Sequence, residues 1–233
     1  MSRLLAIGDL HGCSRALDLL LADVCPRGDD KIVTLGDYID RGPDSKGVLD
    51  RLLDLHRAGR LIPLRGNHEM MLLKARRSPA DQDYWRGYGG DQTLASYSVG
   101  GRPATLDDIP ERHWQFVEEF CSDIYEGDTH FFVHATVLPD RPFANQPTHV
   151  LHWQTFVDHG PHCSGKIMVC GHTEQQSGLP LNVGHAVCLD TWVYGQGWLT
   201  CLDVASGQIW QANQRGQRRG AHLDDFFAPE KRT

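Results

Sequence analysis

The feature that most constrains the fold is a pattern that recurs five times, in which a short apolar run ends in a polar turn. Its most charged occurrence is Ile32-Val33-Thr34-Leu35 followed by Gly36-Asp37-Tyr38-Ile39-Asp40-Arg41-Gly42. A short apolar run bounded by turn signals predicts a buried strand. Open α/β sheets place their ligand-binding groups just past the carboxyl ends of such strands. The pattern therefore predicts an α/β fold whose polar residues gather at strand ends.

The other four runs end in the same way. Residues 4–7 lead to Asp9 and His11, 61–64 to Asn67 and His68, 131–133 to His134, and 167–170 to His172. Amphipathic helical patterns separate the early runs, and from residue 181 onward the pattern changes to strand hairpins. Strands joined by helical crossovers and followed by a β meander predict an α/β sandwich.

The length of 233 residues is enough for a sizeable core, and the sequence shows no linker. We therefore expect a single domain over 1–233. Residues 70–110 have irregular periodicity and predict a helical, lid-like insertion, and the basic stretch within 214–233 predicts a flexible, solvated tail.

Net charge and apolar content restrict the partners. The formal net charge is −7, which argues against nucleic acid or an acidic membrane surface as the main partner. The sequence begins without an apolar leader segment and contains no run of about eighteen apolar residues. The seven cysteines form no C-x-x-C pair, a pattern typical of free thiols in a reducing compartment. These features predict a cytoplasmic protein; they do not indicate its oligomeric state.

The strand-end residues form a mixed set of carboxylate, imidazole and amide side chains. Six of them are candidate metal ligands: Asp9, His11, Asp37, Asn67, His134 and His172. Such a set suits a divalent ion such as Mn²⁺, Fe or Zn²⁺, and it is larger than one catalytic ion needs. Two ions that share one carboxylate would use all six. Two-metal sites of this kind lower the pKa of a bridging water and favour in-line hydrolysis of phosphate esters.

Three motifs in this order resemble the phosphoprotein phosphatase family of calcineurin-like metallophosphoesterases, especially its small bacterial and phage serine/threonine phosphatases. They are Asp9-Leu10-His11-Gly12, the Gly36 to Gly42 segment, and Arg65-Gly66-Asn67-His68-Glu69, and they are followed by His134 and Gly171-His172. The resemblance extends from residue 4 to about residue 213. It implies two mixed β-sheets flanked by helices, with a dinuclear metal centre, most simply manganese, at the strand ends.

The resemblance also implies a role for each matched residue. Asp9, His11 and Asp37 would hold one metal, and Asp37, Asn67, His134 and His172 would hold the other, with Asp37 bridging. Arg41 and Asn67 would bind the phosphate. His68 would act as general acid toward the leaving alkoxide, and Asp40 would orient it.

One position departs from the family pattern. The family usually has a second phosphate-binding arginine two positions after a tryptophan, and this chain has Trp153-Gln154-Thr155 there. Arg141 is a candidate substitute. A missing charged contact would cost about 1.5–3 kcal/mol of phosphate binding.

Several functions are compatible with these residues. The favoured one is a metal-dependent protein serine/threonine phosphatase acting on a phosphorylated protein or peptide. A diadenosine polyphosphate hydrolase shares the same metals, although such enzymes usually carry aspartate where this chain has Glu69. A tyrosine-directed or broad-specificity phosphatase is a further alternative. A non-catalytic phosphoprotein-binding module is disfavoured, because every matched metal and acid position is filled.

Overall fold

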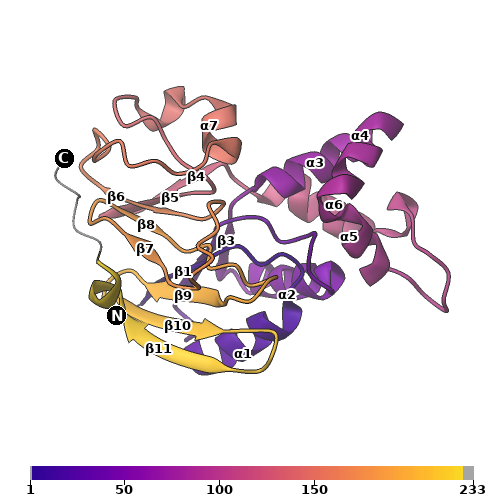
Figure 1. Cartoon of the computed structure of the whole chain (residues 1–233), viewed down its shortest axis with the longest axis horizontal. Helices are drawn as coiled ribbons and strands as arrows, with labels where there is room; N and C mark the ends of the chain where they lie inside the picture. Colours follow the sequence, from indigo (N-terminus) through magenta and orange to yellow (C-terminus); the bar gives the residue numbers. More distant parts are fainter. Residues whose placement is uncertain (1, 228–233) are drawn as a thin grey trace.

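The computed structural model describes residues 2–227, and in it two β-sheets pack face to face (Figure 1). The first sheet has the strand order β11-β10-β9-β1-β2-β3 and the second has the order β4-β5-β6-β8-β7. Each sheet is mixed: β1, β2 and β3 are parallel in the first, as are β5, β6 and β8 in the second, and antiparallel strands complete both. This arrangement confirms the predicted α/β sandwich of two mixed sheets flanked by helices.

The strands are short, and the apolar runs predicted from the sequence all fall on them. They are β1 (Leu4–Ile7), β2 (Lys31–Thr34), β3 (Leu61–Pro63), β4 (Ile124–Glu126), β5 (His130–Val133), β6 (Ile167–Cys170), β7 (Leu181–Asn182), β8 (Ala186–Cys188), β9 (Leu199–Asp203), β10 (Gln208–Ala212) and β11 (Arg218–His222).

The helices occupy three places around the sheets. They are α1 (Ser14–Val24), α2 (Ser45–Arg57), α3 (Asn67–Ala75), α4 (Pro79–Trp85), α5 (Asp91–Ser96), α6 (Glu111–Gln115) and α7 (Thr148–Trp153). Helices α1 and α2 lie on the first sheet, and α7 lies near the second. The group α3 to α6 extends to one side of both sheets (Figure 1). No helix within residues 2–227 is long and apolar enough to cross a membrane.

The alternation of side chains along each strand builds separate apolar layers. On β5, Phe132 points into the cluster between the sheets, whereas Phe131 and Val133 join the cluster on the outer face. On β1, Ala6 lies between the sheets, and its neighbours Leu5 and Ile7 face α1. Both faces of these strands are therefore buried, which explains why they appear in the sequence as continuous apolar runs.

The prediction of a flexible tail from residue 214 is wrong as far as residue 226. Residues 218–222 form β11, which pairs with β10 in register from Gln208↔His222 to Ala212↔Arg218. The arginines are exposed but have partners: Arg218 pairs with Asp23 at 2.7 Å, and the Arg219 guanidinium lies over Trp198. A basic, exposed edge strand lacks the apolar alternation by which strands are recognised. The remainder of the predicted tail, 228–233, lies outside the described residues.

Candidate active site

The six candidate metal ligands come from loops at the carboxyl ends of five parallel strands. Asp9 and His11 follow β1, Asp37 follows β2, Asn67 opens α3 after β3, and the last two histidines follow β5 and β6. The structure brings all six predicted residues together, although they are spread over more than 160 positions of sequence. Apart from His172, which is partly buried, each is at most 6 % exposed.

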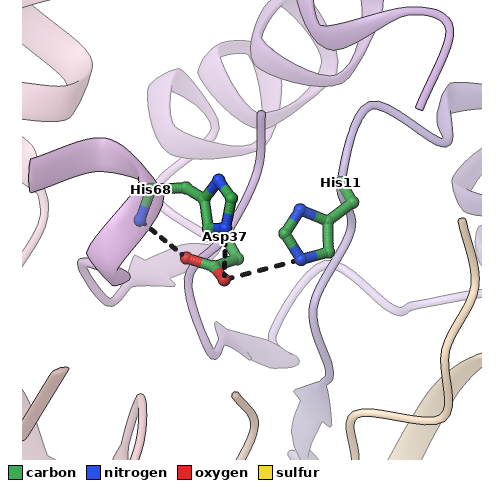
Figure 2. Close-up of side chains that lie close together, drawn as sticks. All are labelled: His11, Asp37 and His68. Carbon is green, nitrogen blue, oxygen red and sulfur yellow. Dashed lines mark hydrogen bonds and ion pairs between the residues drawn. The ribbon is translucent and has the colours of Figure 1, made fainter. Parts of the chain in front are cut away.

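Asp37 lies between two groups of possible ligands. Its Oδ2 is 3.5 Å from His11 Nε2, and its Oδ1 is 3.5 Å from His134 Nε2. Two sets of side chains, His11 with Asp37 and His68, and Asp37 with His134 and His172, offer ligand atoms within 4.8 Å of one another. Figure 2 shows the first set, in which dashed lines join Asp37 to His11 and to His68. Asp37 is common to both sets, as expected for a carboxylate that bridges two ions.

In three of the histidines the far ring nitrogen faces a backbone carbonyl, which favours the tautomer that carries its proton there. His11 Nδ1 lies 2.9 Å from the carbonyl of Ile39, and His134 Nδ1 lies 2.7 Å from that of Leu35. His172 is reversed, since its Nε2 faces the carbonyl of Trp153 at 3.2 Å. A neutral imidazole that donates to a carbonyl on one side presents a lone pair on the other. All three free lone pairs therefore point into the site, as metal-ligating histidines do.

The protonation states favour cation binding. Burial lowers the pKa of His11 and His172, and it lowers the pKa of His134 to about 3, so these rings are neutral near pH 7. Burial opposes ionisation of Asp37, but the surrounding imidazoles, His134 first, outweigh it and hold the pKa of this carboxyl below its usual range. The site thus offers a buried carboxylate and neutral imidazoles, the forms that bind divalent ions.

Asp9 has one buried carboxylate oxygen that fits a cation. Its Oδ2 accepts the backbone N–H of His172 at 3.0 Å, whereas its Oδ1 is buried without any hydrogen-bond partner among the described residues. A Cβ on Gly171 would come within 1.9 Å of that Oδ1, so glycine lets the carboxylate sit against the backbone. Burial first, and then Asp190 and Asp37, raise the pKa of Asp9. A buried, unpaired carboxylate oxygen is costly unless a cation neutralises it. These residues fit a pair of divalent ions.

His68 has a different environment from the other histidines. Its Nδ1 lies 2.6 Å from Asp40 Oδ2, and its Nε2 is directed toward Asp37 at 3.9 Å. Burial by itself lowers the pKa of His68, but Asp37 and Asp40 outweigh burial, and the net effect raises it. A protonated imidazole beside the candidate ligand groups is able to donate a proton. The general-acid role of His68 and the orienting role of Asp40 stay predictions.

Asp40 is itself held by residues that the sequence analysis did not identify. The indole Nε1 of Trp85 donates to both Asp40 oxygens, at 3.1 and 2.9 Å, and Thr93 Oγ1 donates to Oδ1 at 2.6 Å. Both residues belong to the helical insertion, so this segment holds the Asp40 carboxylate that faces His68. Their separation from Asp40 by 45 and 53 positions leaves no local signal in the sequence.

Glu69 also has a structural role that its sequence position alone did not reveal. Its carboxylate accepts three backbone N–H groups, from Asp37 at 2.9 Å, Tyr38 at 2.8 Å and Gly66 at 2.9 Å. The side chain therefore ties the loop after β2 to the start of α3. This contact places Asp37 beside Asn67 and His68.

The backbone of the site adopts uncommon conformations. Among the described non-glycine residues, positive φ occurs at His11, Asp37, Asp40, Arg41 and His172, and elsewhere only at Cys25 and Trp192. Such conformations cost of order 1–3 kcal/mol each and persist where the surrounding structure enforces them. Their concentration at the predicted ligands and acid pair is typical of a functional site.

Thr155, at the position of the family's second phosphate-binding arginine, and Arg141, its candidate substitute, lie in different loops. Thr155 lies just beyond α7 in an extended segment beside the sixth ligand, where Phe156 N–H donates to Thr173 Oγ1 at 2.7 Å. Arg141 lies in the loop after β5, where its carbonyl faces His162 Nε2 at 2.8 Å. Within residues 2–227, no side-chain hydrogen bond or ion pair joins Arg141 to the site. Its proposed role in phosphate binding stays a prediction without geometric support.

The fold and the ligand geometry together define a metal-dependent phosphoesterase. A family model described as "Calcineurin-like phosphoesterase" matches residues 2–176, so the chain belongs to this family. This confirms the resemblance inferred from the motifs, and with it the class of hydrolase and the use of a dinuclear divalent metal centre by the family.

Curated relatives fall into two groups. The chain is 33% identical over 156 residues to serine/threonine-protein phosphatase 1 of Salmonella typhimurium, a match covering 65% of this chain and 63% of the relative. It is 43% identical over 141 residues to the symmetrical bis(5'-nucleosyl)-tetraphosphatase of Ralstonia nicotianae, covering 58% of this chain and 42% of the relative. In both cases the match spans less than two thirds of the relative's length.

Solved structures support the fold at low sequence identity. A cold-active protein-tyrosine phosphatase of a psychrophilic Shewanella species superposes with a TM-score of 0.64 at 17% identity, covering 94% of this chain and 80% of that one. A protein serine/threonine phosphatase from Saccharomyces cerevisiae gives 0.57 at 17% identity, covering 87% and 73%. These likenesses show the shared architecture.

Proposed function

We propose that this chain is a protein serine/threonine phosphatase that hydrolyses phosphomonoesters on a phosphorylated protein or peptide. The observation that carries the proposal is the His68–Asp40 pair, held at 2.6 Å and supported by Trp85 and Thr93 beside the metal-ligand groups. The alkoxide of serine or threonine is a poor leaving group, so its departure benefits most from a positioned acid. The similarity to a serine/threonine-protein phosphatase supports the same substrate class.

Two divalent ions would complete the site. We propose Asp9, His11 and Asp37 as ligands of one, and Asp37, Asn67, His134 and His172 as ligands of the other; Mn²⁺ is the proposed metal, with Fe and Zn²⁺ as alternatives of the same ligand preference. When bound, such ions polarise phosphoryl oxygens and lower the pKa of coordinated water. The protein's own residues then bind the phosphate through Arg41 and Asn67, and protonate the leaving oxygen through His68.

A second candidate is hydrolysis of diadenosine polyphosphates, and the identity to the bis(5'-nucleosyl)-tetraphosphatases favours it. The leaving group would then be a nucleotide, whose phosphate departs with little help from an acid. A tyrosine-directed phosphatase would also depend less on His68, because a phenolate leaves more readily than an alkoxide. The three functions therefore differ in how strongly they require His68.

The first experiment compares kcat/KM of the Mn²⁺-loaded protein on a phosphoserine/threonine peptide, a phosphotyrosine peptide and diadenosine tetraphosphate, with EDTA controls. A lead for phosphoserine or phosphothreonine is the expected result. A lead for the dinucleotide would replace the first proposal by the second. Turnover that persists in EDTA would contradict the metal-dependent mechanism itself.

His68→Asn tests the acid. We expect this variant to keep its metal and to lose about 10²–10⁴ in kcat on alkyl phosphates, with a smaller loss on an aryl phosphate such as p-nitrophenyl phosphate. Metal content by elemental analysis separates this role from metal ligation, because His68 lies within reach of Asp37. Unchanged kcat on the alkyl substrate would remove His68 from the role.

A further inference from the structure

The loop between β8 and β9 brings one tyrosine into contact with the proposed phosphate-binding arginine. The Tyr194 ring centroid lies 4.8 Å from the Arg41 guanidinium carbon and 4.9 Å, edge to face, from the His11 ring. Its hydroxyl donates to Glu174 Oε2, two residues beyond the ligand His172. Tyr194 thus contacts His11 directly and is bonded to Glu174, which follows His172 in the chain. It lies outside every motif that the sequence analysis identified.

The loop that carries Tyr194 is built to hold one conformation. Trp192 has a φ of 63°, unusual for so bulky a side chain. Thr191 Oγ1 donates to the carbonyl of Trp198 at 2.6 Å and closes the loop. A Cβ on Gly197 would lie 1.9 Å from the carbonyl oxygen of Thr191, so only glycine permits this closure. Tyr194 is therefore presented on a rigid support rather than on a freely moving loop.

Arg41 has few other groups to hold it. Among residues 2–227, no carboxylate lies within ion-pair distance of its guanidinium, and its one side-chain hydrogen-bonding neighbour is His11, with Nη1 3.2 Å from Nε2. Since His11 Nδ1 faces the Ile39 carbonyl, that Nε2 lone pair is the one proposed to bind a metal. A metal on His11 would take this acceptor away, and among the described residues the cation–π contact with Tyr194 would be the remaining electrostatic contact of the Arg41 guanidinium.

We propose that Tyr194, fixed by Glu174, is the positioning residue that aims Arg41 at the substrate phosphate. The inference rests on the proposed phosphate-binding role of Arg41. It also bears on the absence of a second phosphate-binding arginine. Because Thr155 supplies no cation, phosphate binding depends more on the orientation of the Arg41 guanidinium. Glu174 and Tyr194 restrain this orientation.

The chemistry of the contact suits such a role. A guanidinium stacked over an aromatic face gains about 0.5–2 kcal/mol, and its N–H groups stay free at the edges. Those edges are what a phosphate needs for paired hydrogen bonds. The Tyr194 hydroxyl donates to the Glu174 carboxylate, which anchors the ring at its polar end. The ring therefore orients Arg41 without competing for the anion.

The test measures anion binding separately from turnover. Titration calorimetry of inorganic phosphate with the Mn²⁺-loaded protein gives Kd, and steady-state kinetics gives KM and kcat. For Tyr194→Leu we expect Kd and KM to rise about 3- to 30-fold, the equivalent of the cation–π energy, while kcat changes by less than about threefold. Tyr194→Phe keeps the ring but loses the bond to Glu174 that fixes it, so we expect a smaller rise in Kd and KM than in Tyr194→Leu, and Glu174→Gln should resemble Tyr194→Phe. The matched control is Tyr125→Leu, which removes a partly buried tyrosine on β4, packed on Phe132 away from the site.

A double-mutant cycle with Arg41→Leu separates the outcomes. If Tyr194 acts through Arg41, Tyr194→Leu should weaken phosphate binding in the parent and add little in the Arg41→Leu background. Equal effects in both backgrounds, or metal loss in Tyr194→Leu measured by elemental analysis, would overturn the positioning role. Weakened phosphate binding in Arg41→Leu together with unaltered binding in Tyr194→Leu would also overturn it, and would leave the proposed function standing. Absence of turnover on every phosphoester would reject the proposed function, while the phosphate titration would still decide the role of Tyr194.

Discussion

At the scale of single residues, Asp37 is the side chain shared by the two groups of possible metal ligands. It is in contact with both groups of ligands, its backbone has a φ of 49°, and its N–H donates to Glu69. Its Oδ1 also accepts the N–H of His68 at 3.1 Å. One carboxylate therefore organises two sets of imidazoles and the first turn of α3. An amide in its place keeps the shape but removes the charge.

We expect Asp37→Asn to lose metal and activity together, because a bridging ligand contributes to both ions. Loss of groups that merely support metal ligands already costs about 10–100-fold, so kcat/KM should fall by at least about 10²-fold, with bound Mn²⁺ falling in parallel by elemental analysis. Asp54→Asn, on the exposed face of α2, is the control and should match the parent. A fully metallated Asp37→Asn protein would contradict the bridging assignment.

At the scale of elements, the helical insertion contacts the sandwich at the loop after β2. Helix α4 ends at Trp85, which is fully buried, and α5 contains Thr93, also fully buried. Both donate to Asp40, which belongs to the loop after β2. Segment 86–90 also approaches this loop, since Arg41 N–H donates to the carbonyl of Gly89 at 3.4 Å. The insertion therefore acts as a support for the acid pair.

Trp85→Phe tests this support. The change keeps an aromatic ring but removes the donor to Asp40, and a hydrogen bond to a charged group contributes about 1.5–3 kcal/mol. We expect kcat on an alkyl phosphate to fall about 10-fold, with a smaller change on p-nitrophenyl phosphate and unchanged metal content. Trp114→Phe is the matched control, because Trp114 is buried in α6 and stacks with Arg76 instead. An equal fall in kcat in the two variants would show that Trp85 contributes only through packing.

At the scale of the whole molecule, local signals in the sequence marked the candidate ligands that the fold gathers, but not the residues that support them. Each candidate ligand lies in the turn just after an apolar run, so the same pattern predicts both the strand and the ligand. The parallel topology then brings the strand ends together. Trp85 and Thr93 lie in a segment of irregular periodicity, and nothing nearby marks them as partners of Asp40. Tyr194 lies between two tryptophans in a loop, where its contact with Arg41 depends entirely on tertiary packing. Strand β11 was missed because its arginines resemble a solvated tail.

An ion pair between Arg3 and Asp30, away from the candidate active site, contributes to the stability of the fold. Asp30, just before β2, is fully buried and accepts from Arg3 at its N–H, Nε and Nη2 with distances of 2.9, 2.9 and 2.6 Å, and from Arg27 N–H at 2.7 Å. Burial opposes ionisation of Asp30, but the bonds to Arg3 and Arg27 outweigh it and hold its pKa well below the usual range. The contact joins the amino-terminal ends of β1 and β2.

Asp30→Asn should therefore lower the free energy of unfolding by about 1.5–3 kcal/mol at pH 7, because it weakens the charge-assisted hydrogen bonds of a partly buried ion pair. A carboxyl whose pKa is depressed by folding stabilises the protein fully above its unfolded pKa of about 4, and this contribution is lost as the pH falls further toward the folded value. Urea unfolding at several pH values should show the parent and the variant converging below about pH 4. Metal content and kcat/KM at pH 7 should match the parent, since Asp30 lies at the opposite strand ends from the ligands. A stability difference that stays constant down to pH 2 would show that the loss comes from packing rather than from the ionised pair.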